Sequence, residues 1–333
     1  MSYEILDRVD NTKKTGAAGL PVQSVSRGRN KIKESIKRYI KVGLVHFMAY
    51  PDTLYGEGPI QETVRRIAED EYFDAIEVTW IRDDRTRAAV KTVIDTSALE
   101  VYYGAQPRLL TTGDNPNAVD EDQRLAAVRN LKAGIDEAAE LGAKGFAFLS
   151  GKYAEESKAE AFDALVDTTV ALCKYSAQKG VPRVALEVFD YDVDKCSLIG
   201  PVALAKQYAE AVCARVDNFG LLADLSHLPL LRETAEESLQ PIKDYIVHAH
   251  MGNAVAQSGC PAYGDLHPRF GFPGGSNDVD ELTAYLRVLL DIGYICKDKP
   301  GVVSFEVKPF GNEDPELVIA NAKRTLNHAW AKI

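Results

Sequence analysis

The chain has 333 residues, of which 46% are hydrophobic and 26% are charged, and its formal net charge is -10. This composition is typical of a globular protein with a large core, and the acidic balance without a dense Lys/Arg run argues against a nucleic-acid or membrane partner. The five cysteines are scattered and show no CxxC spacing, so neither a disulfide framework nor a zinc ribbon is expected.

Residues 1–40 are mostly polar and lack the apolar core of a signal peptide. GAAGLP and SVSRGRNK predict an irregular arm, which the basic stretch KIKESIKRYI follows. Two interpretations stay open for this arm: a surface extension or a subunit contact. No apolar run in the chain approaches the roughly 20 residues that span a bilayer, so we expect a cytoplasmic location.

Short runs rich in β-branched and aromatic residues follow at regular intervals and predict β-strands. They lie at residues 41–48, 74–80, 98–104, 143–150, 183–190, 219–226, 245–252 and 301–310. The runs are apolar on both faces, as are the strands of a parallel sheet that helices cover.

Segments of helical period separate these runs, as in EDQRLAAVRNLKAGIDEAAELG and NDVDELTAYLRVLLDIG. Strict β-then-α alternation over roughly 290 residues predicts an α/β fold, a (β/α)8 TIM barrel, with residues 41–333 as a single catalytic domain. A doubly wound open sheet is the alternative. The turn after the first run, HFMAYPDTLYGEG, argues against it because it contains no GxGxxG.

Polar residues near the strand ends are the candidates for an active site, because a TIM barrel places its site at the carboxyl ends of its strands. In chain order they are His46, Glu77, Glu187, Asp224, His248, His250 and Glu306. A strand alternates its side chains between two faces, so His248 and His250 must point the same way.

Carboxylates of the fifth, sixth and eighth strands, Glu187, Asp224 and Glu306, converge with a histidine of the seventh strand on one mouth. Each alone has a structural interpretation: a salt bridge for either glutamate, a loop cap for Asp224 and a core hydrogen bond for a histidine. Their coincidence favours a divalent-metal site. Three carboxylates and one imidazole form an oxygen-rich set, which suits Mn or Mg better than structural zinc.

Such a site supports proton abstraction next to a carbonyl, because a metal bound to sugar oxygens stabilises the enolate that forms. His227 and the loop GDLHPRFGFPGG, which carries His267 and Arg269, supply further candidate contacts. Arg269 is either a clamp for substrate oxygens or a solvent-facing loop residue. His46 either faces the mouth or packs in the core.

From residue 41 onward the chain resembles the sugar-phosphate isomerase/epimerase superfamily of xylose-isomerase-like TIM barrels. The motifs that carry the resemblance are LEVFD, DLSH, HAHMGN and FEVKP. They imply a ligand set for Mn²⁺, or for Mg²⁺ or another divalent metal, with one residue from each of the last four strands: Glu187, Asp224, His250 and Glu306. The resemblance also implies that His227 and Arg269 contact substrate and that His248 supports the site from one pleat deeper.

The strand-seven loop NAVAQSGCPAYGDLHP, the arm and the turn VHFMAYPDTLYGEG depart from simple ketose 3-epimerases. They are similar to the larger subunit of bacterial C-glycoside deglycosidases. This implies a lyase acting on a 3-oxo-C-glycoside, in which His46 or His267 removes the C2 proton and the aglycone leaves C1 by β-elimination. Tyr50, Tyr55 and Phe270 would stack on a flat aglycone. The resemblance further implies a small β-sandwich partner subunit and a higher oligomer.

Other functions stay open at this point. A Mn-dependent ketose 3-epimerase or sugar isomerase would use Glu187 and Glu306 as its paired acid and base. An endonuclease-type phosphodiesterase shares the barrel but needs further metal ligands and a basic groove, against which six histidines and a charge of -10 argue. An inactive scaffold would bind no metal tightly.

Overall fold

The computed structural model describes residues 32, 34–297 and 299–333. Most of the predicted arm, with its subunit contact, therefore lies outside the described residues. The compact unit that contains the barrel starts at Ile32. Ile36–Arg38 form the short helix η1, and the ring of Tyr39 lies 5.4 Å from the ring of Trp330 near the C-terminus.

The sheet is a closed barrel of parallel strands in chain order, which confirms the predicted TIM barrel and excludes the open sheet. Its strands are β1 (Ile40–Val45), β2 (Ala75–Val78), β3 (Glu100–Gly104), β4 (Phe146–Leu149), β5 (Val184–Glu187), β6 (Phe219–Asp224), β7 (Ile246–Gly252) and β8 (Gly301–Glu306). Each of the eight predicted runs overlaps one of these strands, and seven of them contain the strand whole; β1 starts one residue before its run.

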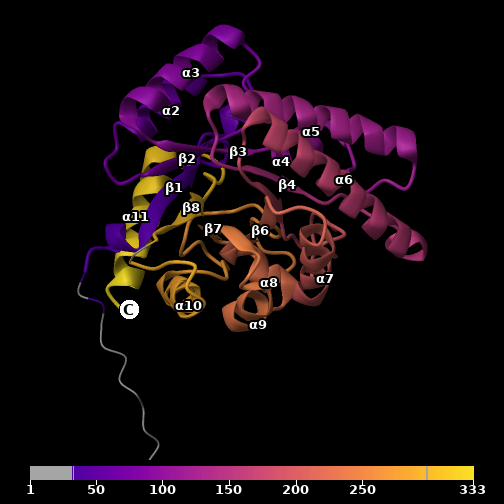
Figure 1. Cartoon of the computed structure of the whole chain (residues 1–333). Helices are drawn as coiled ribbons and strands as arrows, with labels where there is room; N and C mark the ends of the chain where they lie inside the picture. Colours follow the sequence, from indigo (N-terminus) through magenta and orange to yellow (C-terminus); the bar gives the residue numbers. More distant parts are fainter. Residues whose placement is uncertain (1–31, 33, 298) are drawn as a thin grey trace, which may run out of the picture. The chain divides into compact units, whose positions relative to one another are not determined.

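Helices connect successive strands and lie around the outside of the barrel (Figure 1). The longer ones are α2 (Ile60–Ala68), α3 (Asp84–Ser97), α5 (Glu121–Leu141), α6 (Lys158–Lys179), α7 (Val202–Cys213), α10 (Val279–Asp291) and α11 (Pro315–Trp330). Short helices lie mainly in the loops that follow the strands: α1 (His46–Ala49), η2 (Pro51–Thr53), α4 (Gln106–Thr112), η3 (Glu155–Ser157), η4 (Leu225–His227), α8 (Leu228–Leu231), α9 (Ala235–Leu239) and η5 (Gln240–Ile242).

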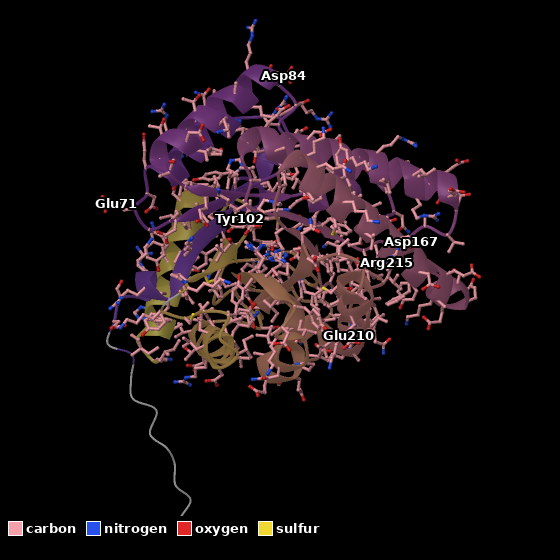
Figure 2. All side chains as sticks on the ribbon, viewed as in Figure 1. Glu71, Asp84, Tyr102, Asp167, Glu210 and Arg215 are labelled. Carbon is pink, nitrogen blue, oxygen red and sulfur yellow. The ribbon has the colours of Figure 1, made fainter. Side chains whose placement is uncertain are left out.

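The main core fills the layer between the barrel and its helices. Leu44, Phe148 and Leu186 of the strands are fully buried in one apolar cluster with Tyr208 and Tyr285 of the helices. Glu71 and Asp84, which are labelled in Figure 2, lie at the periphery, whereas Tyr102 of β3 lies toward the middle. Among the described helices, none combines the length and the apolarity needed to cross a membrane.

Candidate functional site

Four ionisable side chains meet at the carboxyl end of the barrel. Glu187, Asp224 and Glu306 are the last residues of β5, β6 and β8, and His250 of β7 pairs with Asp224 in the strand register. One ligand atom from each lies within 4.8 Å of the others, and all four side chains are buried. The structure thus brings the predicted ligand set together. Its role in metal binding stays a prediction.

The donors of this cluster fit a divalent cation. Oε2 of Glu187 accepts a hydrogen bond of 2.6 Å from Gln106, but its buried Oε1 has no hydrogen-bond partner among the described residues. Burial raises the pKa of Asp224, although His227 acts in the opposite direction. Three buried carboxylates repel one another. A divalent cation would supply the compensating charge and would coordinate the free Oε1 of Glu187.

The ring of His250 is oriented by Glu77 of β2. Nε2 of His250 lies 3.0 and 3.1 Å from the two carboxylate oxygens of Glu77. Nδ1 faces the cluster, 2.6 Å from Oε2 of Glu306 and 3.4 Å from Oε1 of Glu187. When Nε2–H donates to Glu77, Nδ1 keeps its lone pair for a metal, as is usual for ligating histidines.

Glu77 also binds His248, whose Nε2 lies 2.7 Å from Oε1 of Glu77. Burial would raise the pKa of Glu77, but the two imidazoles hold it well below its usual range. His248 was predicted as a substrate-binding or supporting residue. In the structure it adjoins the cluster through Glu77 and through its ring, which lies 5.4 Å from the ring of His250.

A second group of possible ligands adjoins the first and shares Asp224 with it. One atom each of Asp224, His227 and His267 lie within 4.8 Å of one another. Oδ1 of Asp265 lies between the imidazoles, 3.2 Å from Nε2 of His227 and 2.9 Å from Nε2 of His267. Burial lowers the pKa of His267, but Asp265 and Glu306 outweigh it and raise the value to about 9.

The backbone is strained where it presents His267. Its φ of 50° lies in the left-handed region, which side chains other than glycine seldom adopt. The carbonyl of His267 accepts a hydrogen bond of 2.7 Å from the Lys308 amide, which holds this conformation. A Cβ on Gly252 would lie 2.5 Å from the Glu306 carbonyl oxygen and 3.3 Å from Nδ1 of His267, so only glycine fits between these groups.

A cavity of about 160 Å³ lies over the cluster. Its polar lining includes His250, His267, Glu306, Lys195 and Lys308. Its apolar lining comes mainly from loops after the strands and consists of Phe47, Met48, Leu54, Pro107, Leu110, Phe189 and Leu266. The cavity therefore offers charged groups next to apolar side chains.

Residues 64–327 match the model of a family described as the xylose isomerase-like TIM barrel. The chain belongs to this family. No curated protein sequence matches the chain.

Solved structures with the same fold include sugar epimerases. A 3-keto-D-glucoside 4-epimerase, YcjR from E. coli, is 18% identical, with a TM-score of 0.63 over 86% of this chain and 99% of its own. A D-tagatose 3-epimerase-like protein is 20% identical, with a TM-score of 0.66 over 88% and 99%. The IolI protein with a bound zinc atom is 18% identical, with a TM-score of 0.67 over 88% and 99%. At such identities these likenesses establish the fold.

Three polar residues of this xylose isomerase-like site were missed in the sequence. Asp265 was signalled only by the D-x-H spacing in GDLHP. Nζ of Lys195 lies 3.0 Å from Oδ2 of Asp265 and 3.0 Å from Oδ2 of Asp194. Gln106 holds Glu187 from the loop after β3. Lys195 and Gln106 gave no signal, because their positions depend on the path of a loop.

His46 does not lie in the site, and its prediction as the base was wrong. β1 ends at Val45 and a helical turn starts at His46, which directs the ring toward α2. Its Nε2 lies 2.7 Å from the Thr63 hydroxyl, and burial lowers its pKa to about 3. Of the two histidines predicted as the base, His267 lines the cavity and His46 does not.

The predicted aromatic contacts and Arg269 also lie outside the cavity lining. The Tyr50 hydroxyl donates to Glu316 on α11, and Phe270 is fully buried in the core. Nε of Arg269 donates to Glu313 at 2.9 Å. These side chains were predicted from proximity in sequence, but helical turns and loop ion pairs direct them elsewhere.

Proposed function

We propose that the chain is a divalent-metal-dependent enzyme that removes a proton next to the carbonyl of an oxidised sugar, and that it thereby cleaves a 3-oxo-C-glycoside. The observation that carries this proposal is the cluster of Glu187, Asp224, His250 and Glu306 beside a cavity-lining histidine, His267. A cation held by these four residues, Mn²⁺ or Mg²⁺ by their oxygen-rich chemistry, would stabilise negative charge on the sugar oxygens.

His267 is the proposed base. It lines the cavity, and its Nε2 lies 3.6 Å from Oε1 of Glu306, so base and ligands face the same space. In its neutral form His267 takes the proton from C2 of the 3-oxo sugar, and a cation held by the cluster would favour that form by offsetting the carboxylates that raise the pKa of His267 to about 9. Asp265 stabilises the resulting imidazolium. The C2–H electron pair becomes the C1=C2 double bond as the bond from C1 to the aglycone breaks. The aglycone carbon takes up one proton, so no further reactant is needed.

The apolar cavity wall supports an aromatic leaving group. Phe47, Leu54 and Leu110 line the cavity together with the charged residues, whereas Tyr50 and Phe270 do not. Flat aglycones bury well against such surfaces. The proposal retains the small β-sandwich partner subunit and the cytoplasmic location as predictions.

The epimerase alternative has its own support. Glu187 and Glu306 both reach the cluster, as the paired acid and base of a ketose 3-epimerase would. Two of the three solved structures described above carry sugar-epimerase names, and one of them acts on a 3-keto-glucoside by name. An epimerase returns the proton to the opposite face of the sugar and breaks no bond to the aglycone.

Turnover of a 3-oxo-C-glucoside in heavy water separates the two activities. The Mn-loaded protein is incubated with this substrate or with free ketohexoses, with and without a co-expressed partner subunit. Aglycone release that Glu187→Gln abolishes supports the lyase. Deuterium uptake by ketohexoses without aglycone release in either preparation supports the epimerase and overturns the lyase.

Measurement of the metal content per chain tests two further alternatives, the phosphodiesterase and the inactive scaffold. We expect one ion per chain, because the ammonium of Lys195 already neutralises Asp265 in the second group. Two tightly held ions would instead favour a multinuclear phosphodiesterase, and no ion would favour a scaffold.

A further inference from the structure

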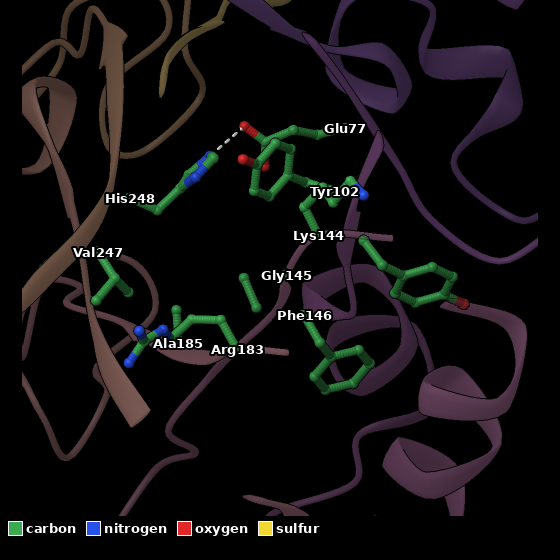
Figure 3. Close-up of a pocket in the computed structure, with 11 residues that line it drawn as sticks. Glu77, Tyr102, Lys144, Gly145, Phe146, Arg183, Ala185, Val247 and His248 are labelled. Carbon is green, nitrogen blue, oxygen red and sulfur yellow. Dashed lines mark hydrogen bonds and ion pairs between the residues drawn. The ribbon is translucent and has the colours of Figure 1, made fainter. Parts of the chain in front are cut away.

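A second cavity lies inside the barrel at the end opposite to the cluster (Figure 3). Its volume is about 170 Å³. Lys144 and Gly145 come directly before β4, and Arg183 comes directly before β5, so the cavity lies at the amino ends of the strands. The activity proposed above uses none of this space.

Small side chains create this cavity. Bulky branched residues usually fill the interior of a TIM barrel in layers. Here Gly145, Ala147 and Ala185 line the interior instead. Ala185 lies two residues before Glu187, so the cavity occupies the layer directly beneath the cluster.

The inner end of the cavity carries a buried polar side chain with a free ring nitrogen. His248 is 5% exposed and lies 4.8 Å, ring to ring, from Tyr102. Nε2 of His248 is bound to Glu77, as the dashed line in Figure 3 marks. Nδ1 makes no hydrogen bond with any described residue. A ligand group in the cavity would satisfy this nitrogen.

The outer part of the cavity has an excess of positive charge. Lys144 is exposed, and its ammonium has no ion-pair partner within the described part of the chain. Arg183 uses NH1 for the carbonyls of Asp217 and Phe219, which leaves its other nitrogens available. The only carboxylate in the lining, Glu77, is already paired with two imidazoles.

We propose that this amino-end cavity binds a small hydroxy acid. The carboxylate lies between Lys144 and Arg183, the short carbon chain packs on Ala147 and Ala185, and the hydroxyl donates to Nδ1 of His248. A water molecule takes up roughly 30 Å³ of liquid, so the cavity admits a ligand of about five or six heavy atoms. Glycolate and lactate have this size and chemistry.

Binding is tested on the Mg²⁺-loaded full chain, with histidine rings labelled at ¹³Cε1. The chain has only six histidines, so the His248 signal is assigned by its loss in His248→Asn. Titration with glycolate or lactate is expected to shift this signal saturably. Acetate, which lacks the hydroxyl, should bind several-fold more weakly. A shift confined to the cluster histidines, or no saturable shift, overturns the proposal.

Two variants locate the ligand. Lys144→Met removes an exposed charge without a fold role and should weaken binding at least about fivefold. Its matched control is Lys206→Met, an exposed lysine of α7, which should bind as the wild type does. Ala185→Leu fills the cavity and should abolish binding. Equal affinity of Lys144→Met and the wild type overturns the proposal, even if the leucine variant fails to fold. The readout needs no catalysis, so failure here leaves the proposed activity intact.

Discussion

The two halves of the barrel contribute differently to the site, although each consists of the same repeated unit. β5 to β8 each supply one side chain of the cluster. β1 to β4 and their loops supply most of the apolar cavity wall and the groups that hold the ligands, Glu77 and Gln106. The half from β5 to β8 therefore carries the side chains of the cluster, and the half from β1 to β4 orients them.

Histidines in the two halves show the same contrast. Burial lowers the pKa of an imidazole in both places. At His46 no charged partner opposes it, so the pKa falls to about 3. At His250, Glu77 and Glu306 outweigh burial and raise the pKa well above its usual range. Position along the barrel thus decides whether a buried histidine is a neutral packing residue or part of an ionic cluster.

Removing a ligand from the second half should have the largest effect. Asp224→Asn is expected to lose the metal and to lower turnover on the order of 10³-fold, because stabilisation of the enolate is lost. Metal analysis and the aglycone-release rate measure both effects. Asp167→Asn, at an exposed ion pair with Arg215, is the matched control. Full metal content in the Asp224 variant would contradict its role.

Substituting each of the two histidines that were predicted as the base tests the contrast between the two halves of the barrel directly. His267→Gln should lower turnover roughly 10² to 10⁴-fold while the chain keeps its metal, because only the base is lost. His46→Gln should leave turnover unchanged, because His46 contacts Thr63 and not the cavity. If a folded His46→Gln chain were inactive, the division between the halves would be wrong.

Substitution of Glu77, which supports His250 from across the barrel, should have an intermediate effect. Glu77→Gln leaves His250 in place but weakens the acceptor for its Nε2–H, so metal affinity should fall about 10- to 100-fold. Competition with a fluorescent chelator measures this affinity. Glu71→Gln, at an exposed site labelled in Figure 2, is the control. An unchanged affinity would show that His250 is oriented without Glu77.

The smallest effect concerns stability and pH. The unfolded chain protonates His46 below about pH 6.5, whereas the folded chain keeps it neutral down to about pH 3. Between these values His46 should lower stability as pH falls, by about 1.4 kcal/mol per pH unit. Urea unfolding at pH 6.5 and 5.0 should therefore show a steeper loss in the wild type than in His46→Gln. Equal slopes would place a compensating charge near His46.

The strands and the cluster were accessible from local sequence. Hydrophobic runs and segments of helical period mark each β–α unit, because burial and backbone periodicity act within a few residues. A residue at the inward position of a strand end has its place set by alternation alone, which is why Glu187, Asp224 and Glu306 were assigned together.

Other features depended on contacts between distant segments. The sequence by itself determined the closed barrel class and the four candidate ligands, since both follow from periodicity and from known motifs at strand ends. Only the tertiary structure decided that Glu77 crosses the barrel to His250, that Lys195 and Asp265 meet, and that His46 turns away toward Thr63. The physical reason is that loop paths and cross-barrel hydrogen bonds depend on packing among segments far apart in the chain, which no local pattern encodes.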